Sequence, residues 1–136
     1  MQNFIGVLII VIITFFSPQE QYDKIDTAAR AIMATREQSG FIRSFFLAIP
    51  CGLLMTFAVR APQPQPMRLF YIMGCVMAFI LGGFYHCVAD MFYTLTGAMN
   101  GKQLFNMFFV TAGNIVGCNI YPAIIKYTEK EFIVEK

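Results

Sequence analysis

The chain has 136 residues, of which 57% are hydrophobic and only 13% are charged. A soluble domain carries about 25% charged residues, so this composition excludes an ordinary soluble domain and indicates an integral membrane protein. The formal charge is +2 and the Lys and Arg residues are scattered, which argues against a nucleic-acid-binding surface.

Four cysteines lie singly inside apolar runs, without the paired spacing of a metal site. We expect them to be buried thiols in packed helices, and we expect neither a metal nor another cofactor. These residues are Cys51, Cys75, Cys87 and Cys118.

The first predicted element covers residues 1–16, which are mostly apolar and are followed by Ser17-Pro18. It has no positively charged start and no small-residue cleavage site, so we do not interpret it as a signal peptide. As a helix it would be about 24 Å long, against a hydrocarbon core of about 30 Å. We therefore predict a partial transmembrane helix whose first turns are missing.

A polar stretch follows from Gln19 to Gly40, with alanine-rich helical character from Asp26 onward. Asp26 or Thr27 could cap that helix at its N-terminus. We expect an amphipathic helix that lies at the surface.

Three longer apolar runs, residues 41–59, 69–96 and 104–127, are predicted to span the membrane. The second has 28 residues, which is long for one straight helix, and the pair Gly82-Gly83 falls near its middle. Glycine costs about 1 kcal/mol relative to alanine inside a helix, so we predict a broken helix at this pair. The fold class is thus an all-α membrane protein with four apolar helical segments, the first truncated and the third broken.

His86 and Asp90 follow the glycine pair and are the only histidine and the only acidic residue of their apolar run. Ionisable side chains at membrane depth are costly, so they usually face a cavity or a partner and mark a pathway for ions or protons. The alternative is that His86 is structural and is hydrogen-bonded to a neighbouring helix.

The last run carries Asn106, Thr111 and Asn114, which could form hydrogen bonds across helices. Gly113 and Gly117 in the same run have the spacing that allows two helices to pack closely.

Charge does not determine the orientation. The segment around Arg60 and Arg68 should lie on the same side as the C-terminal tail. That side would hold five basic residues and the other side five, so the positive-inside rule does not choose between them. The two sets are Arg60, Arg68, Lys126, Lys130 and Lys136, and Lys24, Arg30, Arg36, Arg43 and Lys102.

The segment from Gly83 to Phe92, GFYHCVADMF, is similar to the signature GFEH-x-x-ANMF of the formate/nitrite transporter family. The segment from Asn106 to Gly117, NMFFVTAGNIVG, resembles N-L-x-P-V-T-x-G-N-x-x-G in the family's final helix. Phe41–Val59 is similar to the fourth helix, and Asn3-Phe4-Ile5-Gly6 resembles N-[LIV]-[VI]-G in the third.

This resemblance implies six transmembrane helices in two inverted repeats with an aquaporin-like arrangement. It also implies a pentamer in the inner membrane that carries small monovalent anions such as formate or nitrite, and no enzymatic activity. The chain would cover the end of helix three and helices four to six. The N-terminal half would then be supplied by another chain.

The resemblance also implies a pathway for the anion. His86 matches the central pore histidine that handles the proton, Phe79 and Met55 match constriction positions, and Asn114 belongs to the pathway in the last helix. Arg36 lies where the family has an anion-attracting lysine, and Asp90 where it has an asparagine. Because Asp90 would oppose an anion, we expect these last two residues to form an ion pair.

Two other interpretations stay open. The chain could be a non-conducting fragment or a structural helix-bundle subunit of a membrane complex. It could also be a membrane anchor that binds haem or quinone, although a single histidine without a second axial ligand argues against this.

Overall fold

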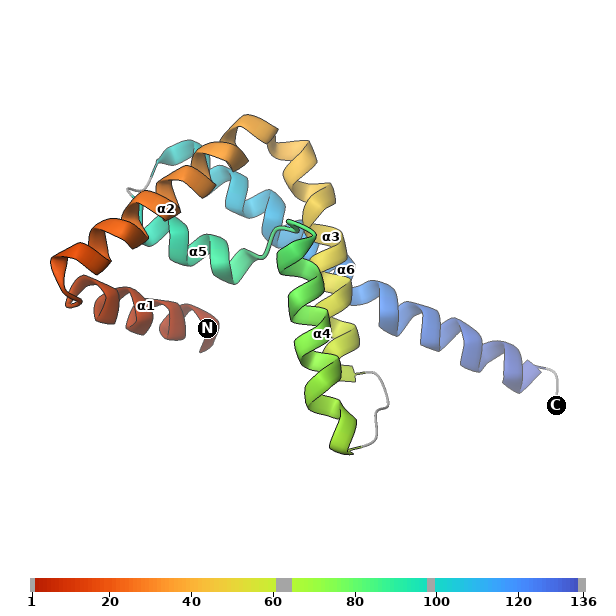
Figure 1. Ribbon diagram of the computed structural model, residues 1–136. Coiled ribbons are helices and arrows are strands. Elements are labelled where there is room, and N and C mark those ends of the chain that lie inside the picture. The colour runs from red at the N-terminus through yellow and green to blue at the C-terminus, as the bar shows by residue number, and fades with distance from the viewer. Residues whose placement is uncertain (1, 61–64, 98–99, 135–136) are drawn as a thin grey trace.

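A computed structural model describes residues 2–60, 65–97 and 100–134, and the regular secondary structure of these residues is all helical. The helices are α1 (Gln2–Phe15), α2 (Gln19–Ser39), α3 (Phe41–Arg60), the short 3-10 helix η1 (Gln65–Met67), α4 (Arg68–Leu81), α5 (Cys87–Thr96) and α6 (Gly101–Val134). Figure 1 shows their arrangement in space. The described residues form no strand, and the all-α prediction is confirmed.

The apolar run of residues 69–96 forms two helices, α4 and α5, with Gly82–His86 between them. The predicted ranges 41–59 and 104–127 fall inside α3 and α6, although α6 extends to Val134. The polar helix α2 begins at Gln19, seven residues before the predicted cap at Asp26. Its first turns contain a Gln19–Asp23 hydrogen bond and a Lys24–Glu20 ion pair at i,i+4 spacing, which support a helix that has few apolar residues there.

Close packing of α3 against α6 forms the centre of the fold (Figure 1). A Cβ atom added to Gly113 or Gly117 on α6 would collide with the backbone carbonyl of Phe45 or Ile49 on α3. On α3, Gly52 faces the Asn114 carbonyl in the same way. Because glycine has no side chain, the backbones of α3 and α6 come close together here, as the glycine spacing in α6 predicted.

The short helix α5 lies between α1 and α2 and also touches α6, whereas α4 runs beside α3 (Figure 1). Two small or flexible side chains of α2, Ala29 and Met33, are buried at 1% and 2% exposure, while its charged residues Glu20 and Lys24 are exposed. The amphipathic helix predicted here therefore covers α5 with its apolar face.

Two helices, Phe41–Arg60 and Gly101–Thr128 within α6, are long and apolar enough to cross a membrane. Two shorter apolar helices, Asn3–Phe15 and Arg68–Leu81, accompany them. Large apolar side chains are exposed on all four, for example Ile13, Phe70 and Phe108. Such surfaces fit lipid or further helices better than water.

Of the four cysteines, Cys51 and Cys75 are buried and Cys87 is half-buried. Cys118 is exposed, so the prediction of a buried thiol is wrong at this position. It lies on α6 next to the contact with α3, where its Sγ atom donates to the Gly52 carbonyl at 3.4 Å.

Candidate functional site

The site begins where α4 stops, at the glycine pair. The Gly83 N–H donates to the Ile80 carbonyl and the Phe84 N–H to the Phe79 carbonyl, each at 3.1 Å. Gly83 has φ of 65°, in the left-handed region that glycine adopts without a Cβ penalty. This pattern is a Schellman motif, which gives the last carbonyls of a helix hydrogen-bond donors and turns the chain away from the helix axis.

His86 begins the next helix. Its backbone is extended, with φ −118° and ψ 119°, and its Nδ1 atom accepts a hydrogen bond from the Ala89 N–H at 3.3 Å. His86 is therefore the N-cap of α5, in place of the usual Ser, Asp or Asn. Because Nδ1 accepts, this contact assigns a neutral imidazole with its proton on Nε2.

Phe79 lies against His86 across the interruption. The two rings are stacked, with centroids 5.4 Å apart and planes 17° from parallel. Phe79 comes from the last turns of α4 and His86 from the start of α5, so the turn at Gly82-Gly83 brings them together. The structure thus places two of the predicted pathway residues in direct contact.

Asn114 on α6 holds the interruption in place. Its Nδ2 donates to the carbonyls of Ala48 at 2.8 Å and Tyr85 at 2.9 Å, and its Oδ1 accepts from the Cys87 N–H at 3.0 Å. The side chain is buried, with the residue at 7% exposure. Asn114 therefore satisfies backbone groups of both α3 and the segment before α5, at a place where water would otherwise be needed.

Arg36 and Asp90 form the expected ion pair, between the last turn of α2 and the first turn of α5. Their side chains are 12% and 2% exposed. The guanidinium also lies over the rings of Tyr85 and Tyr93, 4.5 Å and 5.5 Å from their centroids. Burial lowers the pKa of Arg36 from its ordinary value, because desolvation disfavours the charged form.

Tyr85 is the residue whose importance the sequence did not reveal. It is 8% exposed, its N–H donates to the Leu47 carbonyl of α3 at 3.2 Å, and its hydroxyl lies 3.1 Å from Ser39 Oγ of α2. It thus connects three helices next to His86. Its only sequence signal is its place just before the histidine in the motif, where the family has a glutamate.

Met55 stands apart from the other predicted residues. It is half-buried on α3, two helical turns beyond Ala48, which corresponds to about 10 Å along the helix axis. The structure therefore brings together His86 with Phe79, and Arg36 with Asp90. Asn114 forms hydrogen bonds to the backbone of Tyr85 and Cys87, on either side of His86. Met55 lies away from these residues.

A polar hollow of about 560 Å³ opens on the α2 side of the interruption. His86 is not among its lining residues. They are Thr35, Gln38, Ser39, Arg43, Leu47, Gly82, Gly83 and Tyr85.

Comparison with known proteins assigns the chain to a family. The family model described as formate/nitrite transporter matches residues 1–128. A probable formate transporter from Methanothermobacter thermautotrophicus is 33% identical over 92 residues, which is 61% of this chain and 34% of the relative. No solved structure matches the chain. The aligned region thus spans about a third of the relative's length. The match over nearly the whole chain shows that this protein belongs to the formate/nitrite transporter family, and its membership implies a membrane protein.

Proposed function

We propose that the chain forms half of a transmembrane pathway for a small monovalent anion, such as formate or nitrite, in a multi-pass protein of the inner membrane. The observation that carries this proposal is the contact of Phe79 with His86 at an interruption between two apolar helices. Irregular backbone at membrane depth is tolerated only where it lines a cavity or is buried in protein. The relative's name and the family description supply the class of substrate.

His86 supplies a hydrogen-bond donor to the anion through Nε2, because Nδ1 is occupied by the Ala89 N–H. Proton delivery needs the imidazolium, in which Nδ1 carries a proton and cannot accept a hydrogen bond. The cap of α5 must therefore open when His86 takes up a proton.

A second three-helix repeat is needed to close such a pathway. The exposed apolar faces of α1, α4 and α6 fit against further helices as well as against lipid. In this proposal the chain is one half of an aquaporin-like inverted repeat, and α4 with α5 is its broken helix. An N-terminal half, on this or another polypeptide, supplies the other repeat, and five such units assemble into a pentamer.

The test compares two substitutions of His86 in liposomes that contain the chain together with a preceding three-helix unit. His86→Asn keeps an N-cap acceptor for α5, whereas His86→Phe removes both the cap and the proton-handling group. We expect both variants to lose proton-coupled formate uptake, and only His86→Phe to lose stability. Undiminished proton-coupled uptake by His86→Phe would contradict the role of His86.

A non-conducting structural subunit is the second candidate function. It is favoured by the Arg36–Asp90 pair, because Asp90 neutralises the positive charge at the position where the family attracts its anion. The same liposomes separate the two functions. A structural subunit leaves anion flux at the background level with and without the three-helix unit, although it still binds that unit.

A further inference from the structure

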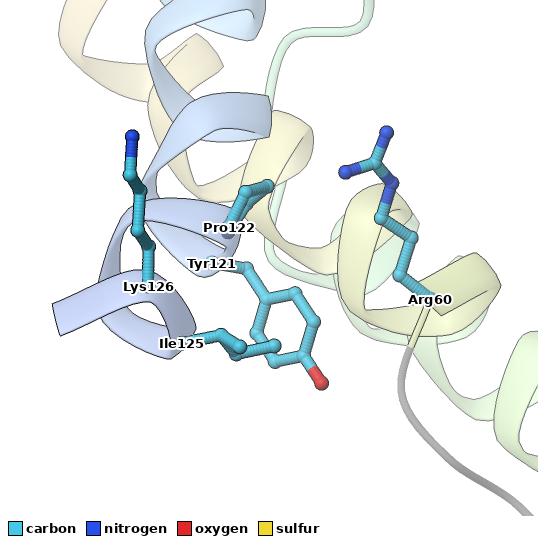
Figure 2. A pocket seen from close by; sticks show the side chains of 5 residues that line it. All are labelled: Arg60, Tyr121, Pro122, Ile125 and Lys126. Atoms are coloured by element: carbon cyan, nitrogen blue, oxygen red, sulfur yellow. The ribbon is translucent and has the colours of Figure 1, made fainter. Parts of the chain in front are cut away.

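A second hollow, away from His86, lies between the end of α3 and the later part of α6. It measures about 410 Å³ and is lined by Arg60, Tyr121, Pro122, Ile125 and Lys126. Figure 2 shows Arg60 on one side, Lys126 on the other and Pro122 between them, with the two charged ends pointing the same way. A volume of this order is within the range of pockets that hold small ligands.

The two cations come from the ends of two apolar helices. Arg60 is the last residue of the apolar helix Phe41–Arg60, and Lys126 lies two residues before the end of the apolar stretch Gly101–Thr128. Their shared pocket places these two helix ends next to each other. In a membrane protein this level corresponds to the boundary between hydrocarbon and head groups.

Apolar and aromatic side chains surround the pair of charges. Val59 and Ile124, the neighbours of Arg60 and Ile125, are 61% and 57% exposed. The ring of Tyr121 packs edge-to-face against Phe57, with centroids 5.7 Å apart. Tyrosine is enriched at this level of membrane proteins because one end of it is apolar and the other polar.

We propose that this pocket binds the phosphate of an anionic phospholipid head group, while the acyl chains lie along the exposed apolar side chains of α3 and α6. Basic pockets between transmembrane helices are suited to such head groups. The guanidinium of Arg60 can form a bidentate pair with phosphate, and the Lys126 ammonium adds a point charge from the opposite wall. The proposal is independent of anion transport and needs only that the chain lies in a membrane.

The experiment measures binding of phosphatidylglycerol and phosphatidylcholine to the full chain in detergent micelles, by native mass spectrometry and by the shift in melting temperature. The test variant is Arg60→Gln/Lys126→Gln. The control is Lys24→Gln/Arg30→Gln, which changes the net charge equally on α2, far along the chain from the pocket. Each basic residue near an anionic surface contributes about fivefold, so we expect the test variant to lose about 30-fold in preference for phosphatidylglycerol, and the control to keep it.

The charge-retaining variant Arg60→Lys/Lys126→Arg controls for misfolding, and it should keep most of the preference for phosphatidylglycerol. A third arm replaces lipid with inorganic phosphate. Equal stabilisation by inorganic phosphate would overturn the assignment to a lipid and indicate a site for free oxyanions. The proposal is also overturned if the wild type does not distinguish the two lipids, or if the test variant binds phosphatidylglycerol as the wild type does.

Discussion

Asp90, in the first turn of α5, is paired with Arg36, in the last turn of α2, and both side chains are largely buried. By the resemblance, Arg36 keeps the positive charge of a lysine, whereas Asp90 adds a negative charge in place of an asparagine. The pair gives the buried Asp90 carboxylate the partner that it would otherwise lack. It also fixes α5 against α2 only four residues after His86.

Removing one partner of this pair should destabilise the protein strongly. We expect Asp90→Asn to lower the free energy of unfolding by about 3–5 kcal/mol, because it leaves the Arg36 guanidinium buried without its counterion. The exchanged pair Arg36→Asp/Asp90→Arg should recover part of this loss, and with it part of any lost anion flux. Recovery is partial because the exchanged pair loses the contact of the guanidinium with Tyr85 and Tyr93.

Glu20→Gln is the matched control for this series. It breaks the Lys24–Glu20 pair of α2, whose side chains are 72% and 82% exposed. Exposed i,i+4 pairs contribute about 0.5 kcal/mol or less, so the melting temperature in detergent should hardly change. If the exchanged pair is no more stable than Asp90→Asn, the pairing of the two charges is not what stabilises this contact.

Asn114 should be far more important for stability than another asparagine of the same helix. Asn114→Ala leaves the Tyr85 carbonyl and the Cys87 N–H without partners, at about 1–3 kcal/mol for each unsatisfied group, and removes the additional bond to the Ala48 carbonyl. Asn119→Ala removes only an exposed hydrogen bond to the Ile115 carbonyl and should cost less than about 1 kcal/mol.

Chemical unfolding of both variants in the same detergent measures the difference. A further variant, Asn114→Asp, can still accept from Cys87 N–H but cannot donate to the Ala48 and Tyr85 carbonyls. We expect it to be nearly as unstable as Asn114→Ala. Equal stabilities for the Asn114→Ala and Asn119→Ala variants would show that the segment before α5 does not depend on this side chain.

How much of this site could be predicted from the sequence depends on how far apart in the chain the interacting residues are. The end of α4 was predictable, because it follows from a local preference of Gly83 for a left-handed backbone. The Arg36–Asp90 pair was predictable because the resemblance put an added negative charge, Asp90, beside a position that keeps its positive charge, Arg36. Hydrogen bonds across helices were expected for Asn114, but their partners could not be predicted, because these bonds join residues 27 to 66 positions apart in the chain.

The early start of α2 and the exposure of Cys118 show the same limit. The first turns of α2 have few apolar residues, so periodicity gave no signal before Asp26, whereas side-chain pairs at i,i+4 spacing extend the helix to Gln19. Cys118 lies in an apolar run, but Gly113 and Gly117 determine which side of α6 packs against α3. A cysteine next to that side is exposed in spite of its apolar neighbours.

Glycines at the contact between α3 and α6 should not tolerate alanine. Gly117→Ala places a methyl group against the Ile49 carbonyl, and overpacking of this kind costs about 1–3 kcal/mol. Gly74→Ala on α4 meets nothing within 4 Å and should be neutral or stabilising by up to about 1 kcal/mol. The melting temperature of Gly117→Ala should therefore fall, while that of Gly74→Ala should stay the same or rise. A Gly117→Ala variant as stable as the wild type would show that the two helices need not pack this closely.

Phe79 should affect the position of His86 in addition to stability. We expect Phe79→Ala to remove the stacked ring and free the imidazole, at a cost of about 0.5–1.5 kcal/mol beyond the loss of buried area. In the assembled transporter this should widen the pathway and weaken discrimination between formate and larger monovalent anions such as acetate. Phe70→Ala is the control, because this ring lies on the same helix and is 71% exposed. Flux of formate and acetate into liposomes measures both effects, and unchanged selectivity in Phe79→Ala would exclude Phe79 from the constriction.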